Sequence, residues 1–355
     1  MCEGAFAESA HHRARSRSEH RRLKLSDRLV DGDSVEVDVQ FAMLFPGQGS
    51  QVVGMGADLV EAFAEARAVF ERADAVLGYA LSEISFRGPL ATLTETRHAQ
   101  PALLTHSVAA LRVLEARGAR PAIVAGHSLG EYSALVAAGA LDFDAALHIV
   151  RRRGELMFAS GVEEPGTMAA VMGLDAAAID AACAASSRLG VCEVANRNAP
   201  DQVVISGSVP AVEDAMRRLE AAGAKLVKRL NVSGAFHSAL MRRPADELAT
   251  YLDGFEVRDA EVPVVANASG RPERQGERLR ALLKRQIASP VLWEESMRAL
   301  RGGCTAPVLE VGAGTVLRGL LRRIDRTAEC TSVGDRAGLE ATLARFPGVG
   351  RQAIG

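Results

Sequence analysis

The sequence predicts an α/β fold, in which a hydrolase-like parallel-sheet domain carries an inserted ferredoxin-like (βαββαβ) small domain. Three observations predict it: short apolar runs alternate with amphipathic helical segments, a Gly-x-Ser-x-Gly pentapeptide follows one such run, and the order of segments changes between residues 163 and 233. With 355 residues, of which 48% are hydrophobic, the chain is long enough to bury the core that this fold needs.

The main domain is expected to begin with a buried strand and an amphipathic helix whose apolar side chains recur every three or four positions. A second helix is expected to start near Pro101, because proline suits the first helical position. The other expected elements of this domain are a strand over 122–125, helices over 131–140 and 143–158, a strand over 262–266, a helix over 277–288, a strand over 307–311 and a helix from 316; the first strand covers 41–45 and the first helix starts at 59. Strands that alternate with helices indicate a parallel sheet covered on both faces.

The small domain is predicted from a change in the order of elements. The expected elements are a strand over 167–172, an Ala-rich helix over 175–189, strands over 191–195 and 202–206, a helix over 209–222 and a strand over 225–230. We therefore assign residues 41–162 and 234–335 to the main domain and 163–233 to the small domain. Residues 1–40 are expected to be a disordered extension, and residues 336–355 a C-terminal tail.

Composition excludes several classes of protein. The net charge of −2 provides no general attraction to nucleic acid or anionic membranes, and no apolar run is long enough to span a bilayer. The five cysteines are scattered and form no C-x-x-C pair, which argues against a disulfide framework or zinc site and fits the reducing cytoplasm. The first forty residues are Arg- and Ser-rich and then acidic; they lack the apolar core of a secretory signal, and their acidic residues weaken the alternative of a transit peptide.

The pentapeptide Gly126-His127-Ser128-Leu129-Gly130 lies between an apolar run and a helical segment. This context predicts a nucleophile elbow, because the two glycines allow a sharp turn that presents the serine hydroxyl. The backbone N–H of Leu129 and the helix N-terminus would then face a developing oxyanion. The alternative is a surface Gly/Ser turn, which the flanking strand and helix disfavour.

A serine nucleophile needs a base at neutral pH, and the chain has eight histidines. His127 precedes the serine, so its side chain should point away from the hydroxyl. His237 lies in a loop between a strand and a helix, where catalytic groups are frequent. From the residues alone, a structural role for His237 stays open.

Several separated motifs resemble one family. They are FPGQGSQ at 45–51, GHSLGEYS at 126–133, Arg153-Gly154 followed by Met157, AFHSALM at 235–241, Gln286 before Ser289-Pro290, and EVG at 310–312. Over about residues 41–335 the chain resembles the malonyl-CoA:acyl carrier protein transacylases and the related acyltransferase domains of polyketide synthases.

The resemblance implies catalytic roles. Ser128 would be the nucleophile and His237 the base, oriented by a backbone carbonyl near Gln286 rather than by a carboxylate. The backbone N–H groups of Gln48 and Leu129 would form the oxyanion hole. Gln286 would lie with Arg153 on the substrate-binding side.

Arg153 carries the implied substrate specificity. A guanidinium binds a carboxylate through two parallel hydrogen bonds, and a malonyl thioester ends in a carboxylate. The alternative is that Arg151-Arg152-Arg153 is a solvated basic run. Leu129 and the sequence Ala235-Phe236-His237 also resemble malonyl-selective relatives, although one methyl group changes selectivity by only about 1–3 kcal/mol.

The implied reaction is a ping-pong transfer of malonyl from malonyl-CoA through an acyl-serine to an acyl carrier protein, supplying fatty acid synthesis. We expect a cytoplasmic monomer that needs no metal or cofactor. Three alternatives remain: an acyl-thioester hydrolase, a catalytically silent carrier-docking module, and a trans-acting enzyme that loads a polyketide carrier protein.

Two further segments allow a functional or a structural interpretation. Residues 312–317 follow an expected strand and partly resemble a dinucleotide fingerprint, but Leu317 stands where Gly or Ala is required, so a tight strand–helix turn is expected. Lys225, Lys228 and Arg229 form a basic stretch that would either help to dock an acidic carrier protein or be ordinary surface charge.

Overall fold

The computed structural model describes residues 39–232 and 234–346, which belong to one compact unit, Glu36–Gly355. The expectation of a disordered extension falls on residues outside this range, except for its last two positions. Those positions belong to the first strand, which starts at Val39. Within the described residues, no helix is both long and apolar enough to cross a membrane.

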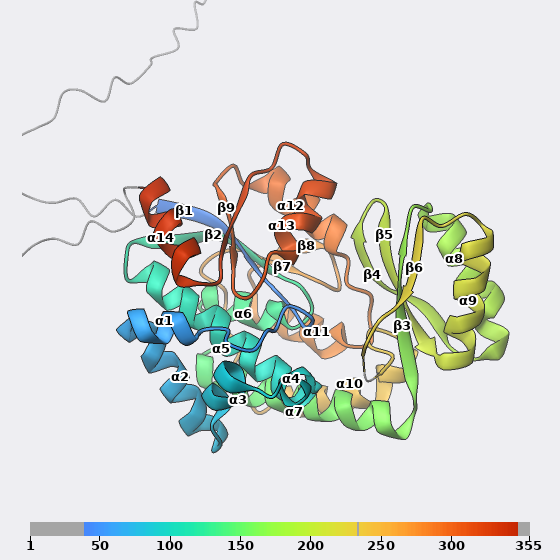
Figure 1. Ribbon diagram of the computed structural model, residues 1–355, viewed down its shortest axis with the longest axis horizontal. Coiled ribbons are helices and arrows are strands. Elements are labelled where there is room, and N and C mark those ends of the chain that lie inside the picture. Colours follow the sequence, from blue (N-terminus) through green and yellow to red (C-terminus); the bar gives the residue numbers. More distant parts are fainter. Residues whose placement is uncertain (1–38, 233, 347–355) are drawn as a thin grey trace, which may run out of the picture. The chain divides into compact units, whose positions relative to one another are not determined.

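The main sheet has the strand order β10-β9-β1-β2-β7-β8 (Figure 1). All neighbours pair in parallel except β8, which runs antiparallel to β7 at one edge. The strands are β1 (Val39–Phe45), β2 (Ala119–Gly126), β7 (Val264–Ala266), β8 (Arg271–Glu273), β9 (Val308–Val311) and β10 (Cys330–Val333). The parallel-sheet part of the predicted fold is therefore confirmed.

Helices cover both faces of this sheet. Successive side chains of β1 point to opposite faces and from Phe41 to Phe45 are all apolar, so each face needs a covering layer. Phe41, Met43 and Phe45 belong to one buried cluster, whereas Ala42 and Leu44 belong to another. Helices α12 (Trp293–Gly303) and α13 (Val316–Ile324) pack in the second cluster. The first, larger cluster takes side chains from α1 (Ala57–Ala62), α2 (Ala64–Leu77), α3 (Leu81–Arg87), α4 (Leu90–Thr94), α5 (Thr96–Glu115), α6 (Gly130–Ala137), α7 (Phe143–Glu163), α10 (Arg242–Leu252), α11 (Gly276–Gln286) and α14 (Arg336–Arg345).

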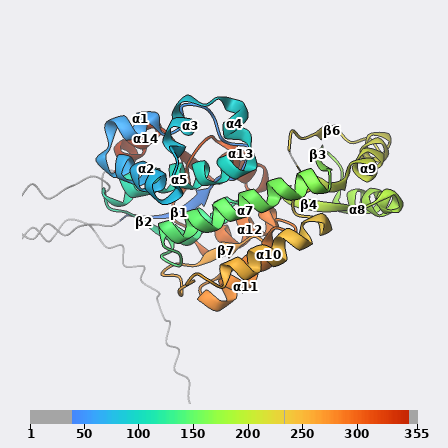
Figure 2. The same cartoon turned by 90° about the horizontal axis from the view of Figure 1, so that it is seen from below.

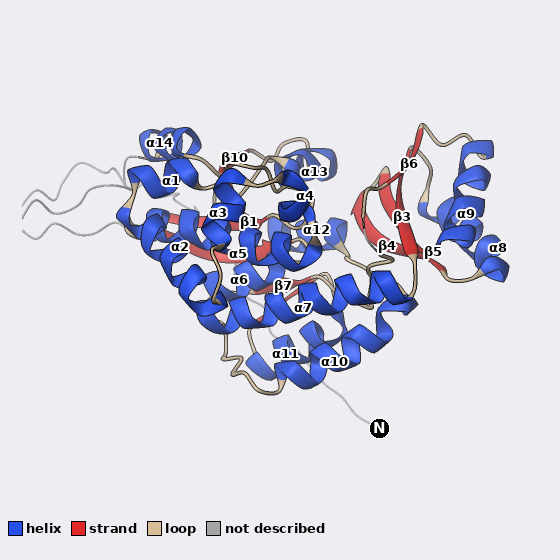
Figure 3. Cartoon of the chain, turned by 60° about the horizontal axis from the view of Figure 1, so that its bottom comes forward, coloured by secondary structure: helices blue, strands red, loops and turns tan. Residues whose placement is uncertain are grey.

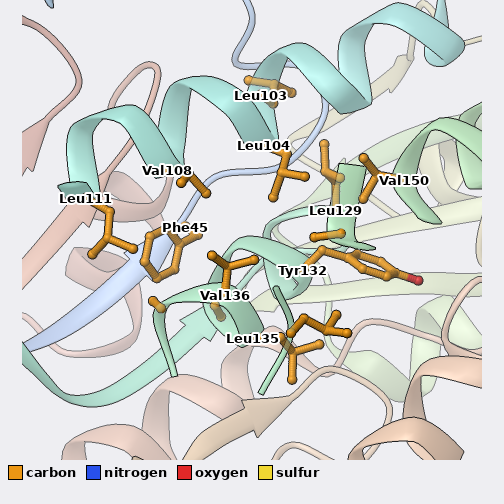
Figure 4. Packing of buried hydrophobic residues seen from close by; sticks show 14 of the residues in the cluster. Phe45, Leu103, Leu104, Val108, Leu111, Leu129, Tyr132, Leu135, Val136 and Val150 are labelled. Carbon is orange, nitrogen blue, oxygen red and sulfur yellow. The ribbon is translucent and has the colours of Figure 1, made fainter. Parts of the chain in front are cut away.

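Helix α5 is buried along most of its length. Leu104, Val108 and Leu111 on one of its faces pack over Phe45 of β1 and Val136 of α6 (Figure 4). Helix α7 lies beside α5 and leads into the small domain (Figure 2). Helices α5 and α6 both pack against β2.

The small domain is a four-stranded antiparallel sheet with the order β4-β5-β3-β6. Its elements are β3 (Gly166–Met172), α8 (Ala176–Ser186), a short 3-10 turn (Ser187–Leu189), β4 (Cys192–Ala199), β5 (Gln202–Ser208), α9 (Val209–Ala221) and β6 (Leu226–Arg229). The two helices cover one face of the sheet (Figure 3) and close a core of their own. The βαββαβ prediction is confirmed.

One strand of the small sheet, β4, is hydrogen-bonded to the main domain. Arg197 N donates to the carbonyl of Val291 at 2.9 Å, and Val291 N donates to the carbonyl of Ala195 at 2.8 Å. This bridge joins β4 to the segment that precedes α12. The small domain is therefore hydrogen-bonded to the chain beside Ser289, which contacts His237.

Three expectations about helices are wrong. Helix α5 begins at Thr96, so Pro101 lies inside it rather than at its start; burial of the helix outweighs the hydrogen bond that proline removes. The first expected helix is broken at Phe63, whose backbone is extended. Residues 336–345 form α14 rather than a tail, because Asp335 caps the helix and Leu339 is buried.

The loop after β9 is the expected strand–helix turn. The Glu310 carboxylate is buried and accepts hydrogen bonds from the backbone N–H groups of Leu317 and Arg318, both at 2.9 Å, and from Ser332 Oγ at 3.2 Å. A side chain of the protein thus occupies the N-terminus of α13, where a dinucleotide fingerprint would bind phosphate.

Replacement of Glu310 by alanine should lower the free energy of unfolding by about 2 kcal/mol, because two backbone N–H groups at the start of α13 lose their acceptor. Urea unfolding measures the change, and alanine at the exposed Glu256 is the control. Equal stability of the two variants would contradict the capping role.

Candidate active site

The elbow has the geometry that the sequence predicts. Strand β2 ends at Gly126, α6 begins at Gly130, and Ser128 between them has a left-handed φ of 50°. A Cβ atom on Gly126 would lie 1.9 Å from Gly130, and one on Gly130 would lie 2.0 Å from the carbonyl oxygen of Phe45. Both glycines are therefore required by close backbone approach, which allows Ser128 to be held in a strained conformation.

His237 contacts the serine hydroxyl, with Nε2 lying 2.7 Å from Ser128 Oγ. Its Nδ1 faces two carbonyl oxygens, those of Gln286 at 3.1 Å and Ser289 at 3.0 Å. Since carbonyls only accept, Nδ1 carries the proton and Nε2 is free to accept from the hydroxyl. Burial, aided by the positive charge of Arg153, lowers the pKa of His237 to about 3, so the imidazole is neutral at physiological pH.

The backbone donors expected for an oxyanion hole are available. In the described part of the chain, neither Leu129 N nor Gln48 N donates a hydrogen bond to a protein acceptor. The Gln48 loop approaches the elbow closely, because a Cβ atom on Gly47 would lie 2.3 Å from the carbonyl oxygen of His127. Ser50 Oγ donates to the Gly47 carbonyl at 2.8 Å and closes this loop.

The guanidinium of Arg153 is buried next to Ser128. Its Nη2 donates to Ser128 Oγ and to Gln286 Oε1, both at 3.0 Å, and its Nη1 donates to Gln100 Oε1 at 2.8 Å. These partners are neutral, and within the described residues no carboxylate forms an ion pair with Arg153. A buried cation without an anionic partner is costly, so the site favours a ligand that brings a negative charge.

The two arginines that precede Arg153 lie at the surface. Arg151 pairs with Glu155 at 2.9 Å, and Arg152 pairs with Glu247 at 3.3 Å. The interpretation as a solvated basic run therefore holds for these two residues and fails for Arg153, which is 1% exposed. Gly154 places α7 against α5, since a Cβ atom there would lie 2.7 Å from the carbonyl oxygen of Thr96.

Two amide side chains bind the backbone of Ser128. Asn267 Oδ1 accepts from Ser128 N at 2.6 Å, and Asn267 Nδ2 donates to the Gly126 carbonyl at 2.7 Å. Gln286 Nε2 donates to the Ser128 carbonyl at 2.9 Å. Both polar backbone groups of the strained serine are thus tied to the main domain.

Sequence reasoning missed Gln100, Asn267 and Glu131. Asn267 directly follows β7, the neighbour of β2 in the sheet, and the carboxyl end of an adjacent parallel strand was a usable signal. Gln100 lies in the buried α5 helix, where nothing in its apolar surroundings marked it.

His127 points away from the hydroxyl, as expected. Its Nε2 lies 2.8 Å from Asn198 Oδ1 of the small domain, and the centroid of its ring lies 5.2 Å from that of Trp293.

The basic stretch of the small domain, Lys225, Lys228 and Arg229, is partly neutralised, because Arg229 pairs with Glu213 at 3.0 Å.

A parallel strand, a strained serine and a helix, with a neutral histidine on the serine hydroxyl, define the class of α/β proteins that carry an acyl group on serine. The acyl transferase domain family matches residues 42–345. The chain belongs to this family, and it is an acyltransferase.

Two named transacylases that are similar to this chain support its membership of the acyl transferase family. The chain is 42% identical over 305 residues to the malonyl CoA-acyl carrier protein transacylase of Bacillus subtilis (strain 168), covering 86% of this chain and 96% of that protein. It is 43% identical over 305 residues to the transacylase of the same name from Escherichia coli (strain K12), covering 86% and 99%.

Two solved structures are similar over nearly their full length. One is a malonyl-transacylase in complex with its type II polyketide synthase acyl-carrier protein, with a TM-score of 0.84 and 43% identity, covering 86% of this chain and 99% of that chain. The other is an acyl carrier protein S-malonyltransferase from Vibrio cholerae, with a TM-score of 0.82 and 44% identity, covering 85% and 99%.

A serine-directed fluorophosphonate should label the protein at Ser128, because the hydroxyl is hydrogen-bonded to a neutral base. Ser128→Ala should abolish labelling, and His237→Ala should slow it by at least about 100-fold. Intact mass and peptide mapping measure both. His148→Ala is the control, because His148 lies on α7 and makes no contact with the Ser128 hydroxyl. Equal labelling rates for wild type and His237→Ala would contradict the base assignment.

Proposed function

We propose that the protein transfers a malonyl group from malonyl-CoA to the phosphopantetheine thiol of an acyl carrier protein, supplying fatty acid synthesis. The observation that carries this proposal is the buried guanidinium of Arg153, 3.0 Å from the nucleophile and without a carboxylate partner among the described residues. The malonyl carboxylate is one methylene away from the thioester carbonyl, so a cation beside Ser128 Oγ suits it. The names of the similar proteins agree with this substrate.

In the first half-reaction, Ser128 Oγ attacks the thioester carbonyl of malonyl-CoA while His237 Nε2 takes the hydroxyl proton. The backbone N–H groups of Leu129 and Gln48 stabilise the oxyanion. The tetrahedral intermediate collapses, the carbon–sulfur bond breaks, and the CoA thiolate receives the proton from His237. Arg153 holds the malonyl carboxylate throughout.

In the second half-reaction, the carrier thiol gives its proton to His237 and attacks the malonyl-serine. Collapse breaks the serine ester bond and returns the proton to Ser128 Oγ, so that both steps use the same base. The reaction requires no metal or redox cofactor, because the nucleophile, the base and the donors are side chains and backbone of this chain. We further propose that the protein acts in the cytoplasm as a monomer.

Loading of a polyketide carrier is the second candidate function. It is favoured by the similar structure in which a malonyl-transacylase is bound to a type II polyketide synthase carrier protein. The same site residues serve both pathways, so the carrier rather than the chemistry distinguishes them.

A cleft lined in part by basic side chains suits an acidic carrier. It has a volume of about 940 Å³ and lies between the β4–β5 turn and α13, lined by Arg322, Arg323 and Arg326. Arg323 pairs with Asp201 at 3.1 Å, whereas Arg322 and Arg326 form no ion pair with a described residue. The loop that leads to α13 packs on the Gln48 loop, since a Cβ atom on Gly312 would lie 2.8 Å from Pro46. We propose that the carrier docks here, rather than on the basic stretch of the small domain.

Mixing with malonyl-CoA should produce a malonyl adduct on Ser128 that moves to holo acyl carrier protein, as intact mass would show. Arg153→Ala should reduce kcat/KM for malonyl-CoA by at least about 100-fold and leave acetyl transfer nearly unchanged, because only malonyl needs the cation. Arg152→Ala, which changes a surface arginine, is the control.

Two results would contradict the proposal. Loss of the adduct to water without loading of the carrier would make the protein a hydrolase. Retained malonyl preference in Arg153→Ala would refute the role of that residue.

Arg322→Glu and Arg326→Glu should each raise KM for the carrier about tenfold through charge repulsion, without changing adduct formation from malonyl-CoA. Lys228→Glu is the matched control on the small domain. A larger effect of Lys228→Glu than of Arg322→Glu and Arg326→Glu would place the docking surface on the small domain instead.

A further inference from the structure

Glu131 is a buried carboxylate that the proposed mechanism does not use. It lies in the first turn of α6, three residues after the nucleophile, and is 1% exposed. One of its oxygens, Oε2, accepts hydrogen bonds from Gln286 Nε2 at 2.7 Å and from Asn267 N at 3.2 Å. A buried charged group is expensive, so its retention beside the site calls for a specific task.

The two residues bound by Glu131 are the ones that hold Ser128. Asn267 binds the backbone N–H of Ser128, and Gln286 binds its carbonyl. A single carboxylate oxygen thereby anchors both residues that hold the strained serine backbone.

Gln286 also contacts the other two catalytic groups. Its backbone carbonyl accepts from His237 Nδ1, and its side-chain Oε1 accepts from Arg153 Nη2. The amide can make these contacts in only one orientation, with its NH₂ toward two acceptors, Glu131 and the Ser128 carbonyl, and its oxygen toward the guanidinium. Reversal would place donor against donor at Arg153.

Glu131 serves this orientation in either protonation state. Burial raises the pKa of Glu131 to about 7, opposed by the hydrogen bonds from Gln286 and Asn267 and by the charge of Arg153. A proton on Oε1 leaves Oε2 an acceptor, so the anchor of Gln286 persists across this range.

We propose that Glu131 is a positioning residue: it anchors the Gln286 amide and, through it, aims the Arg153 guanidinium at the acyl group on Ser128. The inference rests on the proposed function and deepens it, because it makes malonyl selectivity depend on a residue that does not touch the substrate. Glu131 acts by accepting hydrogen bonds, and its charge is secondary.

The measurement is the ratio of kcat/KM for malonyl-CoA to that for acetyl-CoA, with active sites counted by fluorophosphonate labelling. A purely structural defect lowers the active fraction and leaves this ratio unchanged. Glu131→Leu, which removes the acceptor, should lower the ratio at least about tenfold, mainly through KM for malonyl-CoA. Glu131→Gln, whose amide oxygen can still accept, should keep the ratio within about threefold of wild type.

A second background tests whether the effect passes through Gln286. In Gln286→Leu protein Glu131 has no amide side chain to orient toward Arg153, so adding Glu131→Leu should change the ratio by less than about twofold. Glu310→Leu is the matched control, because it removes another fully buried carboxylate that accepts two N–H groups and should leave the ratio unchanged. If Glu131→Leu does not fold, Glu131→Asp replaces it: withdrawal of the carboxylate by one methylene should also lower the ratio.

Each outcome decides the proposal. An unchanged ratio in Glu131→Leu (or in Glu131→Asp, where that variant replaces it), an equal loss in Glu131→Gln and Glu131→Leu, or a full additional loss in the Gln286→Leu background would overturn it. A wild-type ratio well above one together with any of these results overturns the inference alone. A wild-type ratio near one refutes the proposed malonyl function, and with it the inference.

Discussion

The site depends on how closely three pieces of backbone approach one another at the elbow. Gly130 lies against the carbonyl of Phe45, and Gly126 lies against Gly130, so α6 can start directly above the ends of β1 and β2. The parallel register that pairs Phe45 with Gly126 sets this contact. A side chain at either glycine would separate the helix from the sheet and would remove the turn that presents Ser128.

The second constraint is electrostatic. Arg153 is surrounded by amide and hydroxyl oxygens, which stabilise a guanidinium without neutralising it. Burial, with a smaller contribution from this positive charge, lowers the pKa of His237 and keeps its imidazole neutral. Gln286 accepts a hydrogen bond from the guanidinium and donates one to Glu131.

The small domain contributes to the site through its edge strand rather than through its core. Asn198 of β4 holds His127, the residue before the nucleophile, and the Val291 bridge lies next to the Ser289 carbonyl that orients His237. The small domain is thus hydrogen-bonded to the residue before Ser128 and to the segment whose Ser289 carbonyl contacts His237.

Local sequence determined the elements, the two domains and the elbow, because glycine spacing and hydrophobic periodicity act over a few residues. The motifs placed Ser128, His237 and Arg153 through resemblance. Only the tertiary structure decided that Pro101 lies within a buried helix, that residues 336–345 join the fold, and that Asn267 and Gln286 hold Ser128 from 139 and 158 residues away. Asn267 follows the end of β7, the neighbour of β2, whereas Gln286 is the last residue of α11. Folding brings both segments to the end of β2, and the local sequence does not show which backbone group of Ser128 each side chain binds.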